Sequence, residues 1–105
     1  MLNQVVIAGR LTSDPQINEV ENGRKESIIT VAVPRSYKNV DGTYDTDFIQ
    51  CILWNGIAET TCEYCKKGDI VGVKGRIQTE TIDDKTTMKI VAEKVSFLSS
   101  KKSDE

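Results

Sequence analysis

Three aromatic residues are the side chains of this sequence best suited to a specific binding chemistry. Phe48 and Trp54 occupy even positions of the segment 47–54, and Tyr37 comes shortly before it. Each base of an unpaired nucleic acid strand presents a π-face, and stacking on an aromatic ring contributes about 1 to 3 kcal/mol per base. The three residues therefore predict a stacking surface. The alternative is an ordinary core strand, because strands buried between two layers also carry aromatics.

Four basic residues complete this candidate site. They lie on predicted strands and hairpins near the aromatics, at outward-facing positions: Arg10, Arg35, Lys74 and Arg76. Lys and Arg neutralise phosphates, so rings interleaved with cations are the makeup of a groove for single-stranded nucleic acid. The formal net charge is −2 at pH 7, so a site for a polyanion must be local. For Lys74 and Arg76, solvated surface charge is the alternative interpretation.

The segment 47–54 must position Phe48 and Trp54, and it has the β-branched and aromatic content of a strand. Side chains of a strand point alternately to opposite faces. The odd positions Ile49, Cys51 and Leu53 are all compact and apolar. We expect these three residues in a core, and the even positions with their aromatics on the opposite face.

Four other segments alternate in the same way and complete a set of five predicted strands: 3–11, 27–33, 69–79 and 87–98. Hairpin turns are predicted at three places: Asn22-Gly23, Asp41-Gly42 and 81–86. Pro34 should end the second strand, and Gly9 indicates a bulge or a close backbone approach. In the last strand the apolar parity shifts, which predicts a bulge near Glu93 and Lys94.

One segment has helical periodicity. Residues 57–67 place apolar side chains at helical spacing, and Gly68 follows as a C-cap. Lys66 and Lys67 would then lie in the last turn, where cations suit the helix dipole. The order of elements predicts an all-β OB-fold, which is a five-stranded Greek-key barrel, with one helix between strands three and four and long hairpins.

The sequence argues against catalysis and against a metal site. It contains no histidine, no glycine-rich phosphate loop of the Lys-Ser/Thr type and no nucleophile elbow. Two acidic clusters, at 41–47 and 80–84, lie in predicted hairpins, where carboxylates serve turn chemistry and solubility. Cys62 and Cys65 form a Cys-x-x-Cys pair inside the predicted helix, which favours packing over redox chemistry. We therefore expect no enzymatic activity, no metal and no cofactor.

Length and composition limit the number of domains, the cellular location and the redox state of the cysteines. A chain of 105 residues suits one domain, which we expect over residues 1–98, followed by a mobile tail over 99–105. No apolar run approaches the ~18 residues that span a bilayer, and the first residues lack the features of a secretion signal. Three cysteines, an odd number, do not form a disulfide framework. We expect reduced thiols and a cytoplasmic protein.

An ordered set of short motifs resembles a known family. The set runs through the chain as Leu2-Asn3-Gln4-Val5-Val6-Ile7-Ala8-Gly9-Arg10-Leu11, Asp14-Pro15, Asn22-Gly23, Thr30-Val31-Ala32-Val33, Asp47-Phe48-Ile49-Gln50-Cys51 with Trp54, Ala58-Glu59, Lys66-Lys67-Gly68 and Val73-Lys74-Gly75-Arg76-Ile77. No single piece is distinctive, but their order and spacing are. Over residues 1–98 the sequence resembles the bacterial-type single-stranded DNA-binding proteins.

The resemblance implies an OB barrel that assembles as a homotetramer, with single-stranded DNA wrapped over it through stacking aromatics. Tyr37, Phe48 and Trp54 occupy three of the family's stacking positions, and the fourth falls at Ile82, which can pack against a base but cannot stack. Family members act on the nucleoid and usually end in a flexible linker and an acidic tip that recruits replication and repair proteins. Here the last residues, 101–105, are too short for both. Two interpretations stay open: a trimmed chain, or a member of phage or mobile-element type that lacks the recruiting tail.

Two functions are consistent with these features. The first is sequence-tolerant binding of single-stranded DNA, which protects unwound strands in replication, recombination and repair. The second is a replication accessory subunit of the same fold, whose aromatic face packs on a partner protein.

Overall fold

The computed structural model describes residues 1–99. Five long strands and one α-helix form most of it, with a two-residue strand and a short 3-10 helix between the first two long strands. In chain order the elements are β1 (Val5–Leu11), β2 (Asn18–Glu19), η1 (Glu21–Gly23), β3 (Lys25–Lys38), β4 (Tyr44–Trp54), α1 (Asn55–Tyr64), β5 (Ile70–Ile82) and β6 (Lys85–Phe97). As predicted, the helix lies between the third and fourth long strands.

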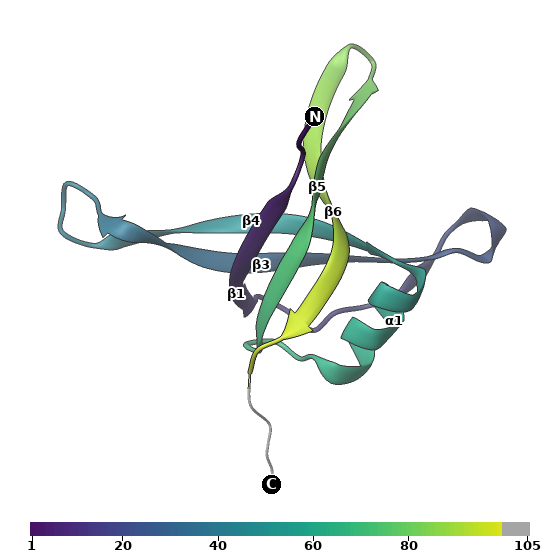
Figure 1. The fold of residues 1–105 in the computed structure, drawn as a ribbon, viewed down its shortest axis with the longest axis horizontal. Coiled ribbons are helices and arrows are strands. Elements are labelled where there is room, and N and C mark those ends of the chain that lie inside the picture. The colour runs from purple at the N-terminus through teal and green to yellow at the C-terminus, as the bar shows by residue number, and fades with distance from the viewer. Residues whose placement is uncertain (100–105) are drawn as a thin grey trace, which may run out of the picture.

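Strand pairing closes the five long strands into a barrel (Figure 1). The sheet order is β1-β5-β6-β4-β3, and β1 also pairs with β3, at Arg10 and Leu11. The pairs are antiparallel except for β4 with β6, which pair in parallel at Cys51 with Ile90 and at Ile52 with Val91. Helix α1 packs against β3, β4 and β6.

The interior confirms the core predicted from residue parity in β4. Cys51 and Leu53 are fully buried, and Ile49 packs against the same cluster while remaining partly exposed. Every strand of the barrel except the two-residue β2 contributes to this core: Leu11, Ile29, Val31, Val71, Val73 and Ala92. Burial raises the pKa of the Cys51 thiol to about 11, because the interior disfavours the thiolate.

Two glycines lie where neighbouring strands approach most closely. A Cβ atom at Gly9 would lie 2.2 Å from the Ala32 carbonyl oxygen of β3, and one at Gly75 would lie 2.2 Å from the Val91 carbonyl oxygen of β6. Both distances are impossible for a real side chain, so the two positions require glycine. The close approach predicted at Gly9 is confirmed.

Local irregularities in the strands were partly predicted. The bulge in β6 is confirmed, because Lys74 pairs with Lys94 while Gly75 pairs with Ala92, which leaves Glu93 extra. The prediction that Pro34 ends its strand is wrong. β3 passes through Pro34 to Lys38, with a break in register between these two residues. Since β1 leaves β3 at Ala32, the proline has only β4 as a neighbour, and its missing N–H is tolerated.

The helix is shorter and begins earlier than predicted. It runs from Asn55, which directly follows β4, to Tyr64, and Cys65 adopts an extended conformation as its C-cap. Lys66 and Lys67 therefore lie beyond the helix, so the dipole argument for them is wrong. Their backbone N–H groups donate to Asp69 and Asp14, respectively.

Three hairpins extend from the barrel as arms, and all three predicted turns are confirmed (Figure 1). The β2–β3 arm turns at Asn22 and Gly23, the β3–β4 arm at residues 39–43, and the β5–β6 arm at Asp83 and Asp84. Asn22, Gly23, Asp83 and Asp84 have positive φ angles. Asp83 and Asp84 form a two-residue turn between Ile82 and Lys85, whereas residues 21–23 form a three-residue connection between Val20 and Arg24. In Figure 1 the β2–β3 and β3–β4 arms point in opposite directions, and the β5–β6 arm rises between them.

At the end of the described chain, Ser99 is held to β5, since its backbone N–H donates to the Ile70 carbonyl and its hydroxyl accepts from the Ile70 N–H. The other residues of the predicted mobile tail, 100–105, lie outside the described residues. Within residues 1–99, no helix has the length and apolar content needed to cross a membrane. The same residues contain no cluster of potential metal ligands.

Candidate nucleic-acid interface

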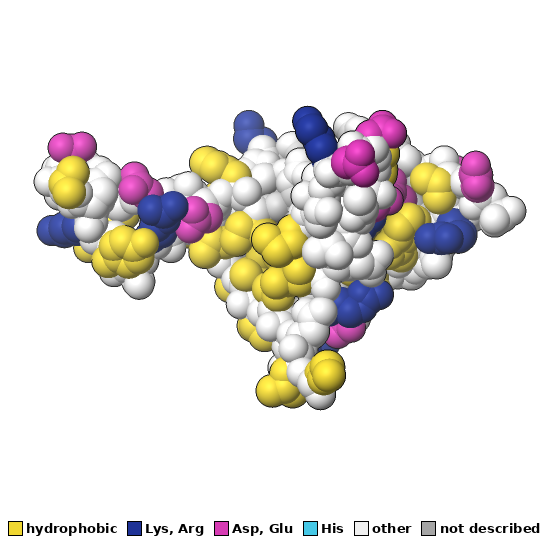
Figure 2. Space-filling model, turned by 90° about the horizontal axis from the view of Figure 1, so that it is seen from above, with side chains coloured by type: hydrophobic (Ala, Val, Ile, Leu, Met, Phe, Trp, Pro, Cys, Tyr) yellow, Lys and Arg dark blue, Asp and Glu magenta, His cyan; other side chains and the backbone are white. Residues whose placement is uncertain are grey.

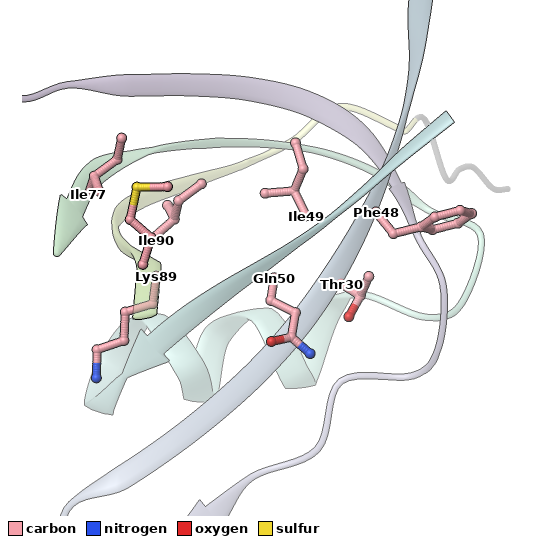
Figure 3. Close-up of a pocket in the computed structure, with 8 residues that line it drawn as sticks. Thr30, Phe48, Ile49, Gln50, Ile77, Lys89 and Ile90 are labelled. Atoms are coloured by element: carbon pink, nitrogen blue, oxygen red, sulfur yellow. The ribbon is translucent and has the colours of Figure 1, made fainter. Parts of the chain in front are cut away.

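An open groove of about 530 Å³ lies between the β3–β4 arm and the β5–β6 arm. Figure 2 shows hydrophobic side chains gathered in a hollow beside the β5–β6 arm. Eight residues from four strands line the groove: Thr30, Phe48, Ile49, Gln50, Ile77, Met88, Lys89 and Ile90. In Figure 3 Phe48 lies at one end of the set and Ile77 at the other, with Ile49 between them.

The groove exists because β4 and β6 pair over a short distance only. Their ladder consists of the two pairs at Cys51 and Ile52, and the two arms diverge outside it. Residues that would be core in a longer barrel are therefore exposed. Ile77 is 39% exposed and Met88 is 71% exposed, although both stand on the apolar parity of their strands. The result is an apolar surface open to solvent, which is suited to flat apolar ligands.

Phe48 has the exposure that a stacking platform requires, since 67% of it is accessible to solvent. It pairs across the β3–β4 ladder with Ala32, and Ala32 pairs on its other side with Arg10. Paired residues of neighbouring strands share a face, so Arg10 and Phe48 lie on the same outer surface with a small alanine between them. The Arg10 guanidinium donates to the Gly68 carbonyl at 2.9 Å.

Trp54 lies at the other end of β4 and is only partly buried. The six-residue separation from Phe48 along an extended strand corresponds to about 20 Å. The Arg24 guanidinium carbon lies 4.3 Å from the centroid of the Trp54 ring system, in a cation–π contact. The two aromatics therefore belong to one outer surface, but they do not contact each other.

Tyr37 and Ile82 stand on different arms, away from the residues that line the groove. Tyr37 is 64% exposed on the β3–β4 arm, and Ile82 is 61% exposed at the end of the β5–β6 arm. The four predicted base-contact residues are thus spread over a wide surface. A strand that touched all of them would have to follow the arms.

The Arg35 side chain is held by two carboxylates of the β3–β4 arm. Its Nη2 and Nε donate to the two oxygens of Asp47 at 2.9 and 3.1 Å, and Asp45 lies 3.6 Å from Nη1. The hydrogen bonds from Arg35 lower the pKa of Asp47, and the carboxylate in turn raises the pKa of Arg35. A phosphate at this position would have to share Arg35 with Asp47.

The two basic residues of β5 differ in their surroundings. Arg76 lies 3.8 Å from a Glu93 oxygen and donates to Gln78. Lys74 pairs in the ladder with Lys94, and within residues 1–99 neither lysine has a carboxylate within ion-pair distance. Like charges opposite each other are unfavourable in a sheet, so these lysines leave positive charge for an anion.

Several residues of this surface were not predicted as site residues, and three of them show what the sequence could and could not indicate. Met88 could have been found, because it shares the parity of Ile90 on the last strand, and its exposure depends only on where the barrel closes. Tyr44 is 56% exposed, with the Lys38 ammonium 6.0 Å from its ring centroid. Arg24 carried no signal in the sequence, since its contact with Trp54 depends on the register between β3 and β4.

Comparison with known proteins gives close relatives among bacterial proteins. The chain is 40% identical over 106 residues to single-stranded DNA-binding protein B of Bacillus subtilis, covering 96% of this chain and 94% of that protein. It is 44% identical over 106 residues to the single-stranded DNA-binding protein of Oceanobacillus iheyensis, covering 96% of this chain and 66% of that protein.

The fold agrees with a solved structure of lower sequence similarity. A deletion mutant of the single-stranded DNA-binding protein from Thermus aquaticus superimposes with a TM-score of 0.80 at 22% identity, over 93% of this chain and 51% of that one. This match confirms the predicted OB-fold. The model of the single-strand binding protein family matches residues 2–98, which is nearly the whole barrel and its arms. By its sequence, this chain belongs to the single-strand binding protein family.

Proposed function

We propose that this protein binds single-stranded DNA without strong sequence preference and protects unwound strands in replication, recombination and repair. As a member of its family it is a binding protein and not an enzyme. The observation that carries the proposal is the position of Phe48, which is two-thirds exposed on the wall of an apolar groove. A contiguous apolar surface that is open to solvent is typical of an interaction site.

Base stacking supplies the sequence tolerance. Every base has a π-face, so a ring that is open on one side accepts all four bases with similar energy. We assign stacking to Tyr37, Phe48 and Trp54, and an apolar base contact to Ile82. Because Phe48 and Trp54 are about 20 Å apart along one strand, different bases of the same DNA strand can use the two rings without competing.

Cations on the same surface hold the sugar-phosphate backbone. We assign this role to Arg10, Arg35, Lys74 and Arg76. Arg10 and Lys74 have no carboxylate partner within the described residues, whereas Arg35 and Arg76 share their charge with Asp47 and Glu93. Affinity should therefore fall with salt, but less steeply than a count of all four basic residues suggests.

We further propose that the protein acts as a homotetramer in the cytoplasm. β1 pairs with β5 over Val5 to Arg10 but reaches β3 only at Arg10 and Leu11, so the rest of its other edge is open. Val6 on this strand is 74% exposed. An open edge beside exposed apolar side chains favours association between copies of the chain.

A titration with oligo(dT) tests the function. Trp54 is the single tryptophan, so its emission reports on one place on the surface. We expect oligo(dT) to quench this emission at about 50 mM salt and the affinity to fall as salt is raised. An unquenched, folded protein that also leaves a labelled oligonucleotide freely tumbling would contradict the proposal. Gel filtration with and without oligo(dT) then distinguishes DNA binding from an accessory role in which only protein contacts form.

A further inference from the structure

The contact between Arg24 and Trp54 joins a cation to an aromatic ring that the function already uses. The guanidinium carbon of Arg24 lies 4.3 Å from the Trp54 centroid. Arg24 is exposed, and within residues 1–99 no carboxylate forms an ion pair with it. Its neighbour Lys25 is different, because Lys25 is paired with Glu59.

The backbone of Arg24 is fixed on both sides. Its carbonyl accepts a hydrogen bond from the Val20 N–H at 2.8 Å, which closes the β2–β3 arm. The next N–H, that of Lys25, donates at 3.2 Å to the side chain of Asn55, the residue that follows Trp54. In addition, Glu26 pairs with Asn18 of β2 on one side and with Trp54 of β4 on the other. These bonds hold the base of the arm against the end of β4, and this arrangement places the Arg24 side chain over the Trp54 ring.

The contact with the indole leaves the hydrogen-bonding capacity of Arg24 intact, because the ring face accepts none of its hydrogen bonds. A guanidinium is planar, and its five N–H groups lie in that plane. The ring therefore restricts the position of the guanidinium without occupying a carboxylate-like acceptor site. An oriented guanidinium without a carboxylate partner is suited to a phosphate, which it can bind through two parallel hydrogen bonds.

We propose that Arg24 is a phosphate-binding residue of the DNA site, held in position by Trp54. The inference rests on the proposed function and adds the β2–β3 arm to the DNA path. The nucleotide whose base reaches Trp54 has its phosphate bound by Arg24. The path then extends from the groove at Phe48 along β4 to this arm, at the opposite end of the strand.

Salt-dependent binding of oligo(dT) to Arg24→Ala, measured by anisotropy of a labelled oligonucleotide, tests the proposal. We expect weaker binding at about 50 mM salt and a slope of log affinity against log salt that is smaller by about 0.7, the value for one phosphate contact on a single strand. Between about 50 and 200 mM salt the deficit should therefore shrink about 2.5-fold. Arg24→Lys keeps the charge but not the planar fork, so it should keep the slope and still bind more weakly than the wild type.

Lys25→Gln is the matched control, since it removes one positive charge from the adjacent residue, which Glu59 already neutralises. Its salt slope should equal that of the wild type. Double-mutant analysis with Trp54→Ala should show that the two losses are not additive, because Trp54 orients Arg24. An unchanged slope in Arg24→Ala, tighter binding by that variant, or full additivity with Trp54→Ala overturns the proposal. If the wild type itself does not bind oligo(dT), the proposed function fails instead.

Discussion

The two ends of β4 present an aromatic ring in different electrostatic settings. At Phe48 the ring is open and borders an apolar groove, and the nearest basic residue of its arm, Arg35, is paired with Asp47 and Asp45. At Trp54 the ring is partly covered by Arg24, a cation without a carboxylate partner among the described residues. One strand therefore carries an open ring beside an apolar groove at one end and a ring in direct contact with a cation at the other.

The salt dependence of DNA affinity can measure this difference, because base stacking and phosphate binding respond differently to salt. Stacking of a base on an uncharged ring releases no counterions, whereas each phosphate contact contributes to the salt dependence. Variants at the Phe48 end should change affinity at every salt concentration by a similar factor. Variants that remove Arg24 at the Trp54 end should change the slope of log affinity against log salt concentration.

The largest effect should come from Phe48→Ala. We expect a loss of about 1 to 3 kcal/mol in binding of oligo(dT), which is the usual contribution of one stacked base, with an unchanged salt slope. The measurement is an anisotropy titration at several salt concentrations. Since Phe48 is 67% exposed, its removal should leave the thermal midpoint nearly unchanged. Equal affinity in a folded Phe48→Ala protein would show that DNA does not use this groove.

Ile82→Trp should add a base-stacking ring to the β5–β6 arm. Ile82 is 61% exposed at the tip of the β5–β6 arm, so a larger ring there meets solvent or DNA and not the core. We expect binding to improve by about 1 kcal/mol without a change in salt slope. The matched variant Ile82→Ala should weaken binding only slightly. A second tryptophan also gives a fluorescence signal from this arm, and absence of quenching by oligo(dT) would place the arm outside the DNA path.

Asp47→Asn should make the Phe48 end more like the Trp54 end. The substitution removes the carboxylate that Arg35 binds at 2.9 Å and retains the side-chain shape. Of its two carboxylate contacts, Arg35 then keeps only the one with Asp45 at 3.6 Å and is more available to a phosphate. We expect a several-fold gain in affinity at about 50 mM salt and a salt slope larger by up to about 0.7. Asp41→Asn, which changes the net charge equally on the same arm but does not touch Arg35, is the control. Identical gains in both variants would indicate a general charge effect.

The smallest expected effect is that of pH. Arg35 lowers the pKa of Asp47, so this carboxylate is ionised throughout weakly acidic and neutral solution. The stabilisation from the pair is present above the ordinary pKa of aspartate and is lost only as pH falls through the lowered value. The sequence also contains no histidine. Affinity for oligo(dT) at constant ionic strength should therefore be flat from about pH 5 to 8, and a rise toward the acidic end would require a titrating group that the site does not contain.

Residue parity predicted most of the barrel because it depends on local sequence alone. The burial of Cys51 and Leu53, the exposure of Phe48 and the bulge at Glu93 all follow from which face of a strand a residue occupies. The order of the elements, with one helix between the third and fourth strands, predicted how the barrel closes. Element ends were less accurate. The helix begins at Asn55, where a positive φ of 50° turns the chain directly out of β4. Asn tolerates this conformation and Asn-Gly favours a turn, but the helical spacing of apolar residues places the start at residue 57.

The electrostatics of the site could not be predicted, because they depend on pairings between distant residues. Arg35 was identified as a candidate, but its neutralisation by Asp47 requires both strands of the β3–β4 arm in register. Arg24 was not identified as a site residue, because it precedes the predicted second strand, 27–33, and follows the predicted turn at Asn22-Gly23. Only the three-dimensional pairing of Glu26 with Trp54 brings it over the indole.

The glycines at the strand crossings have a consequence for how this surface can evolve. Gly9 and Gly75 leave no space for even a methyl group against the carbonyl oxygens of Ala32 and Val91. Any replacement must push β1 from β3 or β5 from β6, and so re-aim the arms that carry Tyr37 and Ile82. A saturation library scored for oligonucleotide retention should therefore tolerate many exchanges on the exposed rims and almost none at these two positions, although neither can touch DNA with a side chain.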